Sequence, residues 1–149
     1  MRAQKRFFRL GWLIALWICV LSVRPSPGNE IVFIVNKGVS ADKLEKEALR
    51  DIFLGNTSVW PDGKKVVFAT SGDPSTHKLF VQPYTRKTES QFQAWWKRKL
   101  FTGTGKVPPR VKTDQEMIDF VAATEGGMGY VSSSAALGDS VKILTVTDK

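Results

Sequence analysis

The chain has 149 residues and a formal net charge of +8; 42% of its residues are hydrophobic and 24% are charged. This composition is typical of a packed globular protein and excludes an intrinsically disordered chain. Only one apolar run approaches the length that crosses a bilayer, so a membrane protein with several spans is also excluded.

Residues 1–28 have the pattern of a secretory signal peptide. They hold five of the 22 basic residues and none of the 14 acidic ones, and they include the apolar run Leu10–Val23. As a helix this run spans about 21 Å, less than the hydrocarbon layer of roughly 30 Å. We expect a signal peptide at 1–28, or an uncleaved membrane anchor as the alternative, and a periplasmic or secreted domain at 29–149.

Charge and cysteine content narrow the range of partners. Residues 29–149 carry a net charge of only +3. The high isoelectric point, about 9.8, is therefore mainly a property of the leader and predicts no nucleic-acid partner. The single cysteine, Cys19, also lies in the leader, and Ile18 before it is too bulky for a lipoprotein cleavage site. No disulfide is expected in the mature domain.

The first elements predicted in the domain are a buried strand and an amphipathic helix. Ile31–Val35 is a short apolar run rich in β-branched residues, as buried strands are. Ser40–Leu54 repeats apolar side chains at helical spacing, and Asp42 and Glu45 have the spacing of a capping box. Gly55 is the expected end of this helix.

A turn at Trp60–Gly63 leads to a second predicted strand, Lys65–Thr70, and then to a short helix. Asp73 is the expected N-cap of that helix, and Pro74 is its expected first residue. The helix is predicted to end just before Pro83, because proline disfavours a helix interior.

A further helix is predicted behind the capping box formed by Thr88 and Gln91. The side chains expected on its core side are Phe92, Trp95, Trp96 and Leu100. The basic run Lys97–Lys99 is expected to be a solvated face, or to meet anionic lipid or a partner if the leader stays in the membrane. A surface for stacking nucleic-acid bases is the weaker alternative, since the tryptophans have core spacing.

The last predicted elements are a helix and two strands. Thr113 and Glu116 have capping-box spacing, and Met128–Val131 and Lys142–Val146 read as strands. The residues expected in the core from this helix are Met117, Ile118, Phe120 and Val121. Alternating strands and helices predict an α/β fold, with a mostly parallel or mixed sheet flanked by helices.

The junction between the second strand and the helix that follows is the most suggestive functional segment. Open α/β sheets bind ligands at the carboxyl ends of strands, and a helix N-terminus offers unpaired amides to an anion. Ser75 and Thr76 add hydroxyl donors, with Ser71 and Gly72 contributing, so the expected ligand is phosphate or a related oxyanion. The alternative is ordinary helix capping, because the Asp73 carboxylate would compete for the same amides.

The sequence contains no evident catalytic or metal-binding constellation. His77 is the only histidine, and Asp73 and Ser75 lie near it, but catalytic triads draw on separate segments rather than one helical turn. We expect His77 to be a surface residue beside the cap and the protein not to be an enzyme. No ligand set for a metal and no glycine motif for a nucleotide is present, so no cofactor is expected.

Several segments, in order, resemble the periplasmic phosphate-binding protein of ABC transporters. They are Leu49–Gly55, Trp60, Val66–Phe80 with its Ser- and Thr-bearing turn, and Gly126–Val131. The chain is similar in more detail to short exported proteins of the phosphate-binding-protein-like domain family, in which Trp96, Phe101–Gly103 and Pro108–Pro109 also have counterparts. The resemblance implies a single lobe of a type II periplasmic-binding-protein-like fold, and it implies phosphate binding.

Two departures from that family's pattern bear on the ligand. The transporter proteins have two lobes and more than twice this length, so half of the ligand shell is absent here. The family's phosphate loop carries an arginine where this chain has Phe68–Thr70, and a serine where it has Pro74. Thr76 matches the family's threonine, and Asp73 or Gly72 matches its acidic position.

These features predict an exported solute-binding protein that binds phosphate or a related oxyanion reversibly and works with an ABC transporter permease or another inner-membrane protein. A homodimer would restore a cleft between two lobes. The alternative is a sensory or adaptor module of a membrane protein that no longer binds a ligand.

Overall fold

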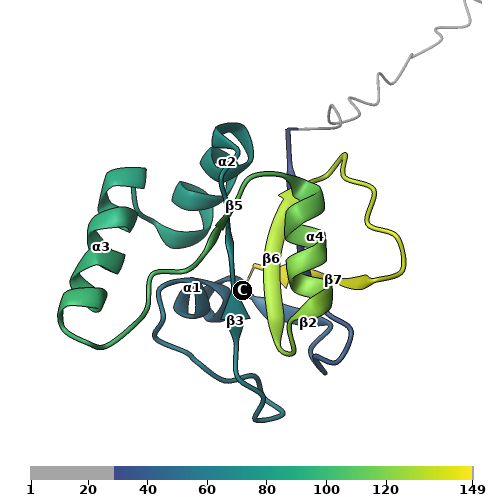
Figure 1. The fold of residues 1–149 in the computed structure, drawn as a ribbon, viewed down its shortest axis with the longest axis horizontal. Coiled ribbons are helices and arrows are strands. Elements are labelled where there is room, and N and C mark those ends of the chain that lie inside the picture. Colours follow the sequence, from purple (N-terminus) through teal and green to yellow (C-terminus); the bar gives the residue numbers. More distant parts are fainter. Residues whose placement is uncertain (1–28, 149) are drawn as a thin grey trace, which may run out of the picture.

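A computed structural model describes residues 29–148, so the predicted signal peptide and Cys19 lie outside the described residues (Figure 1). The strands are β1 (Ile31–Asn36), β2 (Lys43–Glu45), β3 (Val67–Phe68), β4 (Thr70–Ser71), β5 (Arg110–Val111), β6 (Gly127–Ser132) and β7 (Val141–Thr147). The helices are α1 (Lys46–Phe53), α2 (Pro74–Thr85), α3 (Glu89–Phe101) and α4 (Asp114–Ala123). Across these residues, none of the helices is long and apolar enough to cross a bilayer.

The main sheet is mixed, with strand order β2-β7-β1-β6-β3. The central strand β1 runs antiparallel to both of its neighbours, β6 and β7, whereas β2 and β3 pair in parallel at the two edges. A separate two-stranded parallel sheet joins β4 to β5. The prediction of a mixed α/β sheet flanked by helices is confirmed.

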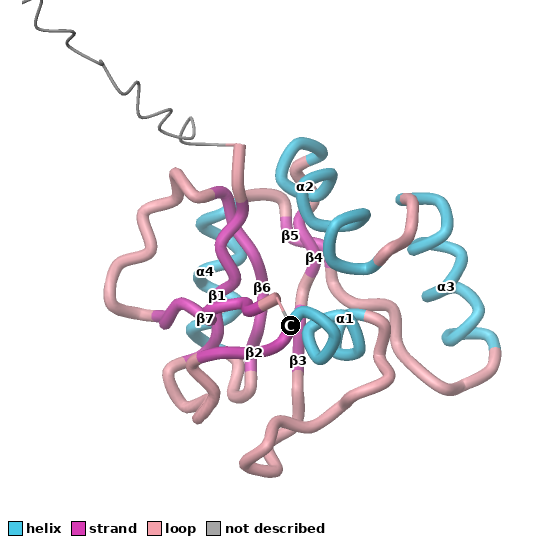
Figure 2. Tube along the Cα trace, turned by 180° about the vertical axis from the view of Figure 1, so that it is seen from behind, coloured by secondary structure: helices cyan, strands magenta, loops and turns pink. Residues whose placement is uncertain are grey.

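Helices cover both faces of this sheet, and successive residues of β1 point to opposite sides. Phe33 and Val35 belong to the larger hydrophobic cluster, formed with α1, α2 and α3, whereas Ile34 belongs to a smaller cluster formed with α4. Figures 1 and 2 show α4 on one face of the sheet and α1 on the other. The large cluster is rich in aromatic rings, and Phe80 stacks on Tyr130 at a centroid distance of 4.1 Å.

The predicted helix over 40–54 begins too early. Residues Lys43–Glu45 form the edge strand β2, which pairs in parallel with β7, so tertiary pairing overrides the helical pattern there. Asp42 is not a cap, because its carboxylate lies 2.6 Å from the ammonium of Lys142 on β7. The predicted end is confirmed: Gly55 has the left-handed φ of 68° that favours glycine after a helix.

The prediction that α2 ends before Pro83 is also wrong. The helix continues to Thr85, and Arg86 ends it in the left-handed conformation. Pro83 itself is exposed, whereas Phe80, Val81 and Thr85 around it are buried. Packing on either side of the proline therefore maintains the helix through the turn that lacks one amide donor.

The predicted strand Lys65–Thr70 is in fact divided between two sheets. The amide of Ala69 donates to Met128 on β6 at 3.2 Å, whereas the amide of Thr70 donates to Pro109 at 2.9 Å. The chain thus changes partners between these two residues and leaves the main sheet for β5. The strand β5 was not predicted, because two residues with one basic side chain carry no pattern.

The two later helices largely follow the prediction. The capping box of Thr88 and Gln91 is present on α3, where Phe92 and Trp96 are buried. Leu100 departs from the prediction, since it is half-exposed at the end of the helix, and Trp95 is only partly buried. On α4 the core residues are Met117, Ile118 and Val121, while Phe120 is partly buried.

Candidate functional site

The candidate site lies where β4 passes into α2. β4 and β5 are parallel, so their carboxyl ends, at Ser71 and Val111, meet at the same edge. Gly72 packs tightly there: its amide donates to the carbonyl of Val111 at 2.5 Å, and a Cβ on Gly72 would lie 2.8 Å from that oxygen. The helix begins with Pro74, as predicted, after the N-cap Asp73.

The four residues predicted to hold an oxyanion are gathered at this junction, but they differ in access. Ser71 and Thr76 are buried, Gly72 is partly buried, and Ser75 is exposed. Only the Ser75 side chain therefore faces solvent freely.

Most of the amides at the junction already have partners within the described residues. The Asp73 carboxylate accepts the amide of Thr76 at 2.8 Å, and this bond holds the pKa of that carboxyl below its usual value. The amide of Asp73 donates to the Ser71 hydroxyl at 3.1 Å, and the amide of Ser71 donates to the Tyr130 hydroxyl at 3.0 Å. The competition by Asp73 that the sequence suggested is thus present in the folded chain.

His77 is a buried residue, 4% exposed, and the expectation of a surface histidine is wrong. Its Nδ1 lies 2.6 Å from the hydroxyl of Tyr130, and its Nε2 lies 2.5 Å from a carboxylate oxygen of Glu89. The ring is drawn inward by residues that follow it by 53 and 12 positions, which local sequence reasoning cannot see. The two ring nitrogens face Tyr130 and Glu89 rather than Asp73 or Ser75, so Asp73, Ser75 and His77 do not form a triad.

Burial lowers the pKa of His77, although the neighbouring Glu89 carboxylate acts in the opposite direction. The ring is therefore neutral at pH 7. In this state Nδ1 accepts the hydroxyl proton of Tyr130, while Nε2 lies against the Glu89 carboxylate without hydrogen-bond geometry. Burial also raises the pKa of Tyr130, so that hydroxyl remains a donor.

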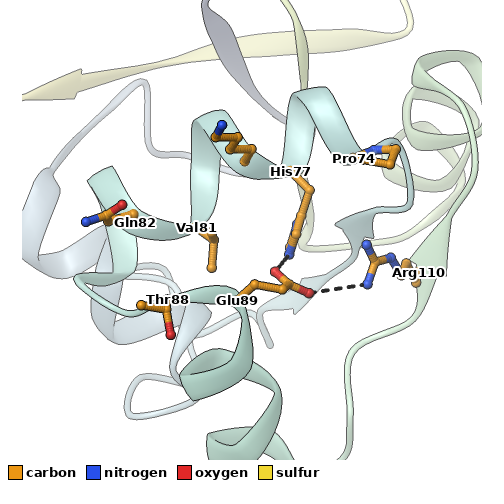
Figure 3. A pocket seen from close by; sticks show the side chains of 8 residues that line it. Pro74, His77, Val81, Gln82, Thr88, Glu89 and Arg110 are labelled. Carbon is orange, nitrogen blue, oxygen red and sulfur yellow. Dashed lines mark ion pairs between the residues drawn. The ribbon is translucent and has the colours of Figure 1, made fainter.

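Glu89 lies between the buried His77 ring and the surface. Burial alone would raise its pKa, but the hydrogen bond from Gln93, together with His77 and Arg110, outweighs burial and lowers it. The guanidinium of Arg110 lies 3.6 Å from the second carboxylate oxygen. Figure 3 shows the Glu89 carboxylate between the His77 ring and Arg110.

A cavity of about 370 Å³ opens beside this cluster. Its walls are the exposed side of α2, the start of α3 and Arg110 of β5 (Figure 3). Lys78 and Arg110 give it two cations against the single carboxylate of Glu89. Sequence reasoning missed Glu89, Arg110 and Tyr130, which come together only because β5 and β6 flank β4 and α2 in space.

The described residues contain no group of three or more His, Cys, Asp or Glu side chains placed to hold a metal ion.

Comparison with known proteins identifies the family. A family model described as a PBP superfamily domain matches residues 25–148. A search of the curated proteins found no significant match.

Solved structures share the fold at low sequence identity. A protein of Clostridium perfringens, solved with bound phosphate and assigned as a phosphate ABC transporter substrate-binding protein, matches with a TM-score of 0.61 and 19% identity over 78% of this chain. An ABC-type phosphate transport receptor of Vibrio cholerae matches with a TM-score of 0.60 and 18% identity over 78% of this chain. PstS of Borrelia burgdorferi matches with a TM-score of 0.57 and 21% identity over 79% of this chain.

The chain spans less than half of each of these proteins, with 44%, 46% and 47% of their lengths covered. The predicted single lobe is confirmed. At these identities the likeness shows the fold alone.

Proposed function

The chain belongs to the PBP superfamily domain family, and from this premise we propose that it is an exported solute-binding protein whose ligand is phosphate or a related oxyanion. The proposed site is the start of α2, with Ser71, Ser75 and Thr76 as donors. Gly72, the fourth residue that the sequence suggested, already donates its amide to Val111, so it would shape the turn rather than hold the ligand. The fold supports this proposal, since the same lobe occurs in a protein solved with bound phosphate. Binding is reversible and involves no covalent step.

The observation that carries the proposal is the Asp73 carboxylate at the helix N-terminus. An anion already sits on the Thr76 amide, which is the kind of group that a phosphate oxygen would accept from. Asp73 is therefore an internal competitor, and an oxyanion must displace it.

Arg110 supplies a cation that the segment before α2 lacks. It lies opposite Thr70 in the register of β4 and β5, and its side chain is half-exposed at the cavity beside Pro74. An oxyanion at the start of α2 would have this guanidinium beside it, although Glu89 neutralises part of its charge.

Affinity from one lobe is expected to be weak. A charge-assisted hydrogen bond contributes about 1.5–3 kcal/mol, and millimolar binding corresponds to about 4 kcal/mol. Two or three such bonds, offset by the displacement of Asp73, bring binding to the millimolar range. A second copy of the chain facing the first would add donors, so a homodimer is expected to bind more tightly than a monomer.

Calorimetric titration of the full chain with phosphate and sulfate tests this proposal. We expect millimolar binding by the unaltered protein and several-fold tighter binding by Asp73→Asn, because asparagine still caps the helix but no longer repels the anion. Asp62→Asn is the matched control: Asp62 is a turn carboxylate that also accepts backbone amides, and its loss should leave the affinity unchanged. Absence of heat in both the unaltered protein and Asp73→Asn would contradict oxyanion binding.

A sensory or adaptor role at a membrane protein, including an ABC transporter permease, is the second candidate. The same observation favours it, since Asp73 satisfies the α2 amides without any ligand. In this case Asp73→Asn would gain no phosphate affinity, and a specific membrane protein would co-purify with the full chain from cross-linked envelopes. Recovery of the chain alone would count against this role.

A further inference from the structure

The end of α3 and the loop that follows it expose apolar and basic side chains together. Phe101 is 88% exposed, Leu100 52% and Val107 50%. These three are among only five large hydrophobic residues that are exposed in the described part of the chain. We call the surface formed by Lys97, Arg98, Leu100, Phe101, Lys106 and Val107 the α3 tip.

The charge around the α3 tip is strongly one-sided. Residues 90–113 contain six basic and no acidic residues, whereas the whole of 29–149 has a net charge of only +3. Lys97, Arg98 and Lys106 make no ion pair with any residue that the structure describes, and all three are exposed. Lys99 is different, because its ammonium donates to the carbonyl of Gly55 at 3.0 Å.

A groove of about 390 Å³ continues the apolar surface into the molecule. It lies between α3 and the segment at 107–110, with Phe92 and Trp96 inside and Leu100 at its edge. Lys97, Arg110 and Glu89 line it as well, and since Glu89 pairs with Arg110, Lys97 is, among the residues described, the free cation beside the apolar residues of the groove.

From this arrangement we propose that the α3 tip binds the surface of an anionic phospholipid bilayer. Phe101 and Leu100 enter the boundary between headgroups and acyl chains, and Lys97, Arg98 and Lys106 lie against lipid phosphates. Bilayers with negative headgroups attract such clusters, and long basic side chains can keep their charge in water while their stems lie on apolar surface.

Two features favour a bilayer over a single-stranded nucleic acid or a protein as the partner of the α3 tip. Stacking of successive bases needs several open aromatic faces, but Phe101 is the one exposed ring of α3. Trp96 is 5% exposed, and Lys87 and Lys99 lie over the Trp95 ring at 4.7 and 5.4 Å. A protein partner of standard size needs a broad apolar centre, whereas here a few apolar side chains protrude among unpaired cations.

Hydrogen exchange of the full chain on vesicles tests the proposal, because it reports on the amides of the α3 tip themselves and because the basic leader is the same in every variant compared. One vesicle type contains phosphatidylglycerol and phosphatidylcholine, and the other contains phosphatidylcholine alone. We expect the amides of 98–107 to exchange several-fold more slowly on the anionic vesicles only. Raising the salt concentration should remove this protection, since it screens the charges.

Two variants keep the outcome decisive. The first variant combines Lys97→Gln, Arg98→Gln and Lys106→Gln, and the second is Phe101→Ser. Each should abolish the protection without unfolding the chain, since these side chains are exposed. Lys37→Gln with Lys43→Gln, also exposed but outside the α3 tip, should leave it intact. Equal exchange on both vesicle types, or protection by an acidic peptide or single-stranded DNA but not by anionic vesicles, would overturn the proposal.

Discussion

The hydroxyl of Tyr130 connects three segments of the chain at a single atom. It accepts the amide of Ser71 on β4 and donates to His77 on α2, while its ring packs in the large cluster from β6. Tyr130 is fully buried, so no water can replace these bonds.

Replacing Tyr130 with phenylalanine keeps the ring and leaves the Ser71 amide and His77 Nδ1 without partners. We expect the free energy of unfolding to fall by about 1–3 kcal/mol, which is the usual cost of unsatisfied buried polar groups. Urea unfolding measures the change. Tyr84→Phe is the matched control: Tyr84 is half-buried and its hydroxyl makes no hydrogen bond within the described residues, so an equal loss there would contradict this role of Tyr130.

His77 also makes stability depend on pH, because burial holds its folded pKa below the ordinary value of 6.5. As the pH falls below 6.5, the unfolded chain takes up a proton at His77 before the folded chain does, so stability is lost on acidification. Glu89, with its lowered pKa, acts in the same direction but only below about pH 4.5.

His77 is the only histidine, so the pH dependence of stability between pH 7 and 5.5 should follow this residue. We expect the unfolding free energy to decrease there by at most about 1.4 kcal/mol per pH unit. Denaturation at a series of pH values checks this, with His77→Gln expected to flatten the profile. A second variant, Glu89→Gln, removes the charge that raises the His77 pKa and should extend the loss to lower pH. An unchanged profile in both variants would assign the effect to other groups.

At the scale of elements, the turn into β6 depends on a close approach of two backbones. Gly126 has a left-handed φ of 68°, and a Cβ there would lie 2.0 Å from the carbonyl oxygen of Lys65. The carbonyl of Gly126 also accepts the buried indole N–H of Trp60 at 3.0 Å. This turn therefore fixes the position of β3 against β6.

Gly126→Ala is expected to destabilise the protein by about 3–5 kcal/mol, through left-handed strain and backbone overlap together. Gly63→Ala separates the two causes. Gly63 has a φ of 85°, but a Cβ there would meet no atom within 4 Å, so only the strain of about 1–2 kcal/mol should be measured. Thermal unfolding of both variants measures the difference, and equal losses would mean that the overlap is relieved by movement of Lys65.

Helices and strands with a long hydrophobic pattern or a helix-capping residue were mostly predictable from the sequence. Short strands that depend on pairing with a distant strand were not. The side chains of Asp73, Thr88 and Thr113 cap their helices as predicted, because capping is a local interaction. Glu116, however, accepts the amide of Lys112 and does not complete a box with Thr113. The predicted cap at Asp42 was wrong, because Asp42 pairs with Lys142. β2 and β5 are strands because they pair with β7 and β4, which are distant in the sequence. The two or three residues of each strand carry no pattern that predicts this pairing. The same reasoning explains the site: its cap was visible in sequence, whereas the partners of His77 were not.

At the scale of the whole molecule, the described residues form one lobe with a five-stranded main sheet and two hydrophobic clusters. The proposed ligand site is at the edge of this lobe rather than between two walls. Binding at this site would therefore gain from a second wall, such as the second copy of the chain proposed above.

The central position of β1 has a consequence for how this chain acquires its structure. β1 begins the described domain, yet its hydrogen-bonding neighbours are β6 and β7, so that Val35 pairs with Met128 and Phe33 with Leu144. Contacts between such distant parts of a chain form slowly, because a long loop must close before they are made. During synthesis the main sheet cannot form completely until β7 has left the ribosome, because the central strand β1 lacks a neighbour until then.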